Sequence, residues 1–204
     1  MPGTIHKTIE EIQALGGRAM AIKTDVASEE EVNAMVQKTL DVCGSVDVLV
    51  NNAGVAVPGS IAELTAKRWD LVMAVNVKGT FLCSKAVLPA MMGQKSGSII
   101  NLSSVLANRR ILKGGVPYGV TKAAIERFTR GLAEEVKEYN IAVNALVADF
   151  TKTEGSLIAF AGFDMSSWLE PEVWGKYCVF LASQDARSLT GQCLTLEDLE
   201  KLCR

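Results

Sequence analysis

Two kinds of segment alternate along the chain, and this alternation limits the folds open to it. Stretches with helical periodicity are separated by short apolar or β-branched runs bounded by glycine or polar residues. The predicted helices span 5–15, 29–43, 63–75, 77–93, 118–139 and 171–183, and the predicted strands run from Arg18 to Asp25, Val46 to Val50, Ser98 to Leu102, Ile141 to Val147 and Cys193 to Leu196. Short apolar strands between helices are typical of a parallel sheet covered by helices on both faces.

Composition narrows the range of functions. The 204 residues are 49% hydrophobic and 22% charged, with a formal net charge of −2, which is typical of one ordinary globular domain. We find no basic cluster, which argues against nucleic acid as a partner. Met1 to Lys7 has no apolar signal core, and no apolar run approaches the roughly 20 residues that span a bilayer. The sequence therefore predicts a protein that acts away from nucleic acid and membranes.

Histidine and cysteine content points away from metal and triad chemistry. The chain has one histidine, His6, which argues against a Ser-His-Asp triad and a His-rich metal site. Five cysteines are scattered without C-x-x-C spacing. They are interpreted as reduced thiols in the cytoplasm, mostly packing residues, and no metal site is predicted.

Tyr118 and Lys122 are the residues most suggestive of chemistry. They stand four apart at the start of a predicted helix, so their side chains share one face. Burial raises a tyrosine pKa, whereas a nearby cation lowers the pKa toward the value a general acid/base needs. Ser104 could then hold a carbonyl oxygen. The alternative is a half-buried helix tyrosine beside a solvated lysine.

Polar residues gather where the predicted strands end. In open parallel sheets, ligands bind at the carboxyl ends of the strands. The polar residues found at such ends are Asp25, Asn51-Asn52, Ser103-Ser104 and Thr151 to Thr153. Their common position predicts a binding site at this edge of the sheet.

Four motifs together resemble the short-chain dehydrogenase/reductase family. They are Asn51-Asn52-Ala53-Gly54, Asn76-Val77-Lys78-Gly79, Ser103-Ser104 and Tyr118-x-x-x-Lys122. Their order and spacing carry the resemblance, which covers residues 5–192. It implies a Rossmann-like α/β fold with a doubly wound parallel sheet in three α/β/α layers. It also implies hydride transfer between NAD or NADP and a small alcohol/carbonyl substrate.

The resemblance assigns roles to four catalytic residues. Tyr118 would exchange a proton with the substrate oxygen, and Ser104 would polarise the carbonyl. Lys122 would lower the Tyr118 pKa and bind the nicotinamide ribose. Asn76 would hold a water in a proton relay, unless it is only a helix-capping residue.

The resemblance also implies a cofactor-binding surface built from loops. Its members are Asp25, Val26, Asn52, Ala53, Gly54, Thr151 and Thr153, together with Tyr118 and Lys122. The first two would contact the adenine and the next three the adenosine ribose. Thr151 would meet the carboxamide and Thr153 the phosphates. Asp25 has an alternative role as the cap of a turn.

The sequence departs from the family pattern at its start. The family opens with a strand, a glycine-rich turn, a helix and a second strand, whereas this chain opens at about the next helix and so is missing the first β-α-β unit. The strands Arg18 to Asp25 and Val46 to Val50 would then flank a gap in the sheet, and we expect the first to shift and pair with the second.

Two further departures lie near the predicted site. Asp149 replaces the family's Pro-Gly after the strand that ends at Val147, and the spacing from Ser104 to Tyr118 is one residue longer than usual. Arg109 and Arg110 fall on the rim, where they either meet an acidic substrate or lie in solvent. Residues 153–171 form either a lid or a plain connection with a helical turn.

Two functions from different classes remain open at this point. The first is an NAD(P)-dependent oxidoreductase, a single domain over 1–204 that forms a homo-oligomer, dimer or tetramer, through the helices at 77–93 and 118–139. The second is a non-catalytic truncated relative that acts as an oligomerisation or binding module. The set of catalytic motifs favours the first, and the missing phosphate loop favours the second.

Overall fold

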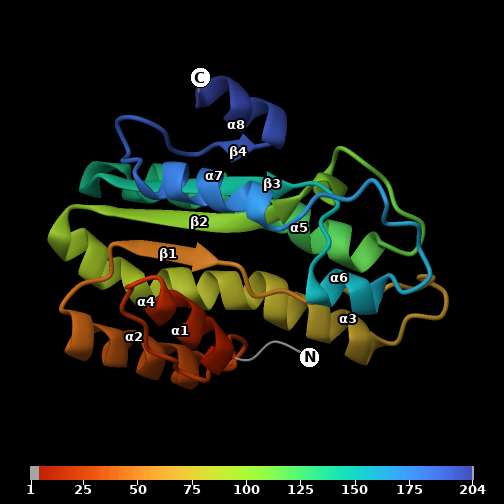
Figure 1. Cartoon of the computed structure of the whole chain (residues 1–204), viewed down its shortest axis with the longest axis horizontal. Coiled ribbons are helices and arrows are strands. Elements are labelled where there is room, and N and C mark those ends of the chain that lie inside the picture. The colour runs from red at the N-terminus through yellow and green to blue at the C-terminus, as the bar shows by residue number, and fades with distance from the viewer. Residues whose placement is uncertain (1–4, 204) are drawn as a thin grey trace.

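The computed structural model describes residues 5–203 and centres on a parallel sheet (Figure 1). Four strands pair in chain order, β1-β2-β3-β4, and all pairs are parallel. The longest pairing joins β2 to β3 over eight residues on each strand, from Gly97 opposite Ile141 to Ser104 opposite Ala148. The strands are β1 (Val48–Asn51), β2 (Gly97–Ser104), β3 (Ile141–Ala148) and β4 (Cys193–Leu194). The predicted α/β fold with a parallel sheet is thus confirmed.

Helices occupy most of the remaining chain. They are α1 (Ile5–Ala14), α2 (Glu29–Cys43), α3 (Ala66–Met73), α4 (Gly79–Gln94), α5 (Val116–Val136), α6 (Glu154–Ala159), α7 (Glu172–Ala182) and α8 (Leu196–Leu202). Short helical turns also lie at η1 (Ala74–Lys78), η2 (Val105–Ala107) and η3 (Lys137–Tyr139). Predicted and observed bounds agree closely for α2, where the Ser28 hydroxyl accepts the Glu31 N–H and caps the helix.

Alternating side chains of the sheet pack into two apolar cores. Ile99 of β2 packs in a cluster with residues of α4 and α5, whereas its neighbour Ile100 packs in a second cluster with residues of α7 and α8. Successive side chains of a strand point to opposite faces, so helices cover both faces of the sheet at β2. This is the three-layer arrangement that the alternating sequence predicts.

Helices α3 and α4 form one continuous stretch, where the sequence suggested two helices. The turn η1 between them has π-helical hydrogen bonding, which adds one residue without breaking the rod. By length and composition alone, the stretch Ala66–Gln94 could cross a membrane, but 44% of its apolar window is buried inside the protein. It packs against α2, β1, β2 and α5 as a core helix.

The segment from Arg18 to Asp25 is not a strand, so its predicted pairing with β1 is wrong. Its end is drawn into a turn instead: the Asp25 N–H donates to Glu31 Oε2 at 2.7 Å, and the Ser28 N–H donates to the Asp25 carbonyl. Val26 then packs on the start of α4. Within residues 5–203, no backbone partner covers the outer edge of β1.

The last strand is shorter than predicted, and the long connection after β3 is partly ordered. Thr195 leaves β4 because its side chain and that of Asp198 form a capping box that starts α8. Within 153–171 the chain forms α6, and Thr151 bridges to Leu169. The region therefore contains a helical turn, and its role as a lid or as a plain connection stays a prediction.

Candidate active site

Tyr118 and Lys122 lie one turn apart near the start of α5, as their spacing predicted. The Lys122 side chain is buried, with 4% of the residue exposed, and its ammonium donates a 2.6 Å hydrogen bond to the Leu102 carbonyl of β2. The Lys122 Nζ lies 5.3 Å from the centroid of the Tyr118 ring. The ammonium therefore faces the ring and the strand end.

Burial controls the pKa of both groups. It raises the pKa of Tyr118 to about 12, while a side-chain hydrogen bond from Ser104 acts in the opposite direction. Burial lowers the pKa of Lys122 to about 8. Burial outweighs the effect of Ser104 on the pKa of Tyr118, and the lowering of that pKa by Lys122 stays a prediction.

The two serines at the end of β2 point in different directions. The Ser103 hydroxyl donates to Glu126 Oε1 at 3.0 Å, on the α5 side of the sheet. Ser104 lies close enough to Tyr118 to lower the pKa of the phenol, and its hydroxyl accepts the Leu106 N–H at 3.2 Å. Ser104 is thus the serine that lies beside the phenol, and only 8% of it is exposed.

Asn76 lies in the π-helical turn η1 and is fully buried. Its amide donates to the Val55 carbonyl and to the Thr121 hydroxyl, each at 3.0 Å, and its Oδ1 accepts the Val55 N–H at 2.8 Å. Its side chain therefore joins the loop after β1 to the second turn of α5. Whether Asn76 also holds a water stays a prediction. π-Helical turns are frequent at functional sites.

The loop after β1 passes close to the lysine. A side chain added at Gly54 would place its Cβ 3.5 Å from Asn76 Oδ1 and 3.8 Å from Lys122 Nζ. Residues Asn52, Ala53 and Gly54 are nevertheless exposed. The backbone thus offers an open surface directly beside two buried polar side chains.

Asp25 and Val26 lie in the loop before α2, where Asp25 contacts α2 and Val26 contacts the start of α4. Asp25 Oδ1 accepts the Ala27 N–H at 2.9 Å, which is the turn-capping role considered from sequence. Val26 packs on the start of α4 so closely that a Cβ at Gly79 would lie 2.9 Å from Val26 Cγ2. Lys78 Nζ also donates to the Ala27 carbonyl at 3.0 Å.

Thr151 and Thr153 follow β3 and are both engaged locally. The Thr151 hydroxyl donates to the Asp149 carbonyl and accepts the indole N–H of Trp174 at 2.9 Å. The Thr153 hydroxyl accepts the Ser156 N–H and caps α6. Neither hydroxyl is brought into contact with Tyr118 or Lys122, so the structure brings together the catalytic set more fully than the cofactor set.

The two rim arginines form ion pairs, an outcome that neither sequence interpretation included. Arg110 pairs with Asp149 at 3.1 Å, and its guanidinium lies 5.7 Å from the Phe150 ring centroid. Arg109 pairs with Glu126 at 2.7 Å. Asp149, the departure from the family pattern, is thus neutralised within the chain.

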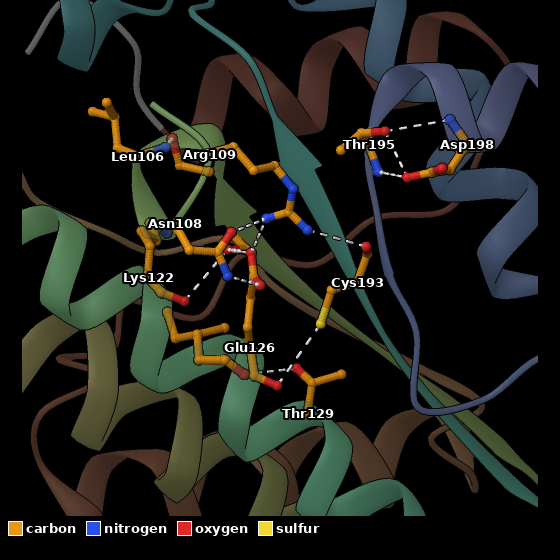
Figure 2. A network of polar contacts seen from close by, with 12 residues as sticks. Leu106, Asn108, Arg109, Lys122, Glu126, Thr129, Cys193, Thr195 and Asp198 are labelled. Carbon is orange, nitrogen blue, oxygen red and sulfur yellow. Dashed lines mark hydrogen bonds and ion pairs between the residues drawn. The ribbon is translucent and has the colours of Figure 1, made fainter. Parts of the chain in front are cut away.

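Sequence reasoning missed Glu126, which is almost completely buried at 1% exposed. Its carboxylate accepts a hydrogen bond from Ser103. It also accepts hydrogen bonds from Asn108 and Arg109 (Figure 2). One signal was available: Glu126 follows Lys122 by four residues and therefore lies on the same face of α5. Within the described part of the chain, no group of three or more His, Cys, Asp or Glu could hold a metal.

The arrangement joins a protonated phenol, a hydroxyl donor and a low-pKa lysine at the carboxyl ends of β1 and β2. A phenol and a hydroxyl on one side of a substrate oxygen can donate two hydrogen bonds to it. A phenol in such a place can also pass a proton to that oxygen. The chemistry that the geometry allows is proton transfer to or from an oxygen held beside Ser104.

The proteins named here that resemble this chain in sequence are dehydrogenases and reductases. The profile of a family described as short chain dehydrogenase matches residues 1–157. A 3-oxoacyl-[acyl-carrier-protein] reductase FabG of Staphylococcus aureus is 35% identical over 91% of this chain and 78% of its own length. Subunit BbsD of a (2S)-[(R)-hydroxy(phenyl)methyl]succinyl-CoA dehydrogenase from Thauera aromatica is 32% identical over 93% of this chain and 79% of its own length.

Solved structures show the same relationship. A gluconate 5-dehydrogenase from Burkholderia cenocepacia, in complex with NADP and tartrate, superposes with a TM-score of 0.83. It is 27% identical and covers 93% of this chain and 78% of its own. ElxO with NADP bound has the same TM-score and identity, and covers 98% of this chain and 86% of its own.

Proposed function

The chain belongs to the short-chain dehydrogenase family, and from that premise we propose that it is an oxidoreductase that transfers a hydride between NAD(P) and a small alcohol or carbonyl compound. The observation that carries the proposal is that Ser104 and Lys122 both lie next to Tyr118, at the carboxyl ends of parallel strands. This is where ligands bind in open α/β sheets.

Tyr118 is the acid/base of the proposed reaction. Because its pKa is raised to about 12, the phenol holds its proton at neutral pH and is ready to donate it to a carbonyl oxygen. Ser104 donates a hydrogen bond to the same oxygen and so favours the negative charge that develops there. In the direction of alcohol oxidation, Tyr118 would accept the proton back.

The residues present fit a nicotinamide cofactor at the lysine end of the site. The cofactor, when bound, supplies or accepts the hydride. The exposed backbone of Asn52, Ala53 and Gly54 beside the Lys122 ammonium suits a ribose, since glycine leaves room for close approach. Two of the solved relatives named above hold NADP, and NADP(H) is therefore the first cofactor to test, with NAD(H) second.

We place the protein in the cytoplasm and expect it to form a dimer or tetramer. All five cysteines are free thiols in the structure, which suits a reducing compartment. The outer surfaces of α4 and α5 carry exposed apolar side chains, among them Phe81, Val116 and Val120. Such residues support contact with a second copy of the chain.

One observation favours a second candidate function, a non-catalytic binding or oligomerisation module. The outer edge of β1 has no partner among residues 5–203, and the side chains of Val48 and Val50 on this strand leave these residues 40% and 44% exposed on one face. An open strand edge is a template for pairing with another chain. The engaged hydroxyl of Thr153 at its helix cap also leaves it less available to a cofactor phosphate.

Turnover distinguishes the two candidates. The purified chain is assayed for NADPH and NADH oxidation against a panel of small carbonyl compounds and 3-oxoacyl thioesters. We expect Tyr118→Phe to lower kcat by about 10²- to 10⁴-fold, while Tyr139→Phe, in the turn η3 that follows α5, retains activity. Equal rates for the wild type and Tyr118→Phe, or no turnover with any of the panel, would favour the non-catalytic candidate.

A further inference from the structure

A buried acid lies directly behind the proposed catalytic residues. Tyr118, Lys122 and Glu126 occupy three successive turns on one face of α5, and the Glu126 side chain is only 2% exposed. An isolated buried carboxylate is costly, whereas one that is paired and hydrogen-bonded can be retained. Glu126 must therefore keep its partners for the folded chain to tolerate it.

Those partners converge on the segment that carries Ser104. Ser103, its neighbour in β2, donates to Glu126 Oε1 at 3.0 Å, and Asn108 donates to Oε2 at 3.2 Å. The turn η2 lies between Ser103 and Asn108. The Ser104 hydroxyl accepts the N–H of Leu106 in this turn. Glu126 is thus hydrogen-bonded to the chain on both sides of Ser104, at Ser103 and at Asn108.

Arg109 completes the set of groups that contact the Glu126 carboxylate, and it links them to β4. Its Nη1 lies 2.7 Å from Glu126 Oε1, and its Nη2 donates to the Cys193 carbonyl of β4 at 3.5 Å (Figure 2). The Cys193 thiol donates back to the Glu126 carbonyl at 3.8 Å. One carboxylate therefore connects α5, the end of β2, the loop at 108–109 and β4.

We infer that Glu126, with Arg109, is a positioning residue for the proposed reaction: it fixes the end of β2 against α5 so that the Ser104 hydroxyl stays in hydrogen-bonding position beside Tyr118. Neither Glu126 nor Arg109 touches the phenol. Their effect passes through Ser103 and through the turn η2. The inference rests on the proposed function for its kinetic consequence, but its structural consequence is independent of that function.

The kinetic test is a double-mutant cycle between Glu126→Gln and Ser103→Ala, with Glu29→Gln as the matched control. Glu29 also forms a 2.7 Å ion pair, with Lys85, but at an exposed site far from Ser104. Because small misplacements of a reacting group are costly, each single variant is expected to lower kcat about tenfold with an unchanged KM for the cofactor. The double variant should lose little more than either single, because both break one linkage.

Hydrogen exchange at the Leu106 amide supplies a readout that needs no activity. Its protection is expected to fall in Glu126→Gln and Ser103→Ala and to stay at the wild-type level in Glu29→Gln, while the core strands remain protected. Unchanged Leu106 protection in both site variants, or full additivity of their kcat losses, would overturn the inference. A wild type without turnover but with the expected loss of protection would refute the proposed function and leave the positioning network in place.

Discussion

At the residue scale, the site is governed by how burial sets the charges of two side chains. Burial raises the pKa of Tyr118 to about 12 and lowers the pKa of Lys122 to about 8, so each residue is pushed toward its neutral form. The Lys122 ammonium lies over the face of the ring and donates to the Leu102 carbonyl. The phenol is consequently a ready acid at neutral pH, and a base only where something further stabilises the phenolate.

Titration of the phenol tests this balance directly. Ultraviolet phenolate absorbance is recorded against pH for the wild type and for Tyr118→Phe, and the difference isolates Tyr118 from the other tyrosines. Because its pKa is raised from 10.0 to about 12, we expect no phenolate from Tyr118 at pH 10. A difference signal that is complete by pH 10 would show that the lysine, and not burial, dominates.

Lys122 should lower the free energy of unfolding, although it contributes to the proposed site. Its pKa falls from 10.5 to about 8 on folding, so the unfolded chain binds the proton more tightly and the folded state is penalised most below pH 8. The penalty is about 3 kcal/mol, partly offset by the bond to the Leu102 carbonyl, so Lys122→Met should stabilise the fold by about 1–2 kcal/mol at pH 7.

The pH dependence distinguishes this cause from ordinary packing. The gain in unfolding free energy should shrink as the pH rises from 8 to 10.5, where the wild-type lysine loses its charge in both states. Urea unfolding at several pH values measures it. A gain that is constant across that window would mean that the added methionine acts through its apolar contacts alone.

At the element scale, the start of α5 and the turn η2 meet through a glycine. A Cβ at Gly119 would lie 2.8 Å from the Leu106 carbonyl oxygen, a backbone atom that cannot move aside cheaply. Gly119 stands between Tyr118 and the turn that begins at Ser104. The close approach of these two elements is therefore what brings the phenol and the hydroxyl together.

Gly119→Ala should separate them. We expect it to lower kcat/KM about tenfold or more and to destabilise the fold by about 1–3 kcal/mol, since overpacking forces a backbone shift. The matched control is Gly131→Ala on the same helix, where the nearest atom to the added Cβ is Arg127 Nη1 at 3.6 Å. That variant should gain about 0.5–1 kcal/mol from helix propensity. Equal behaviour of the two variants would contradict the role given to Gly119.

Sequence patterns predicted the elements that are specified locally. Ser28 and the acidic turn after it mark the start of α2, and the spacing of Tyr118 and Lys122 places both on one face of α5. The prediction of a strand from Arg18 to Asp25 was wrong for a nonlocal reason. An apolar run forms a strand only when a neighbouring strand supplies hydrogen bonds. Glu126 was missed because its partners come from loops and strands that only the fold brings together.

Viewed as a whole molecule, the structure divides into a well-packed body and a lightly held N-terminal part. The body comprises the sheet with α4, α5 and α7, and it contains most of the fully buried side chains. No residue of α1 is buried, and Leu15 just after it is 90% exposed. Segments with few buried contacts open at a lower free energy than the core.

Limited proteolysis should follow that division. Trypsin is expected to cleave first after Arg18 or Lys23, which are exposed and outside any helix or strand, and to leave α5 intact although Arg127 on it is also exposed. Mass spectrometry of the early fragments identifies the bonds cut. First cleavage within α5 or between β2 and α5 would show that the site itself is the least stable part of the molecule.

The central claim is that this chain binds a nicotinamide cofactor beside Gly54 and Lys122, and the most direct measurement is energy transfer from its three tryptophans to NADPH and NADH. The control is Gly54→Val, which would fill the open surface next to Lys122. We expect saturable, micromolar binding of at least one reduced cofactor to the wild type, with clear weakening in Gly54→Val. No transfer up to millimolar cofactor, or equal binding by the two proteins, would contradict the account.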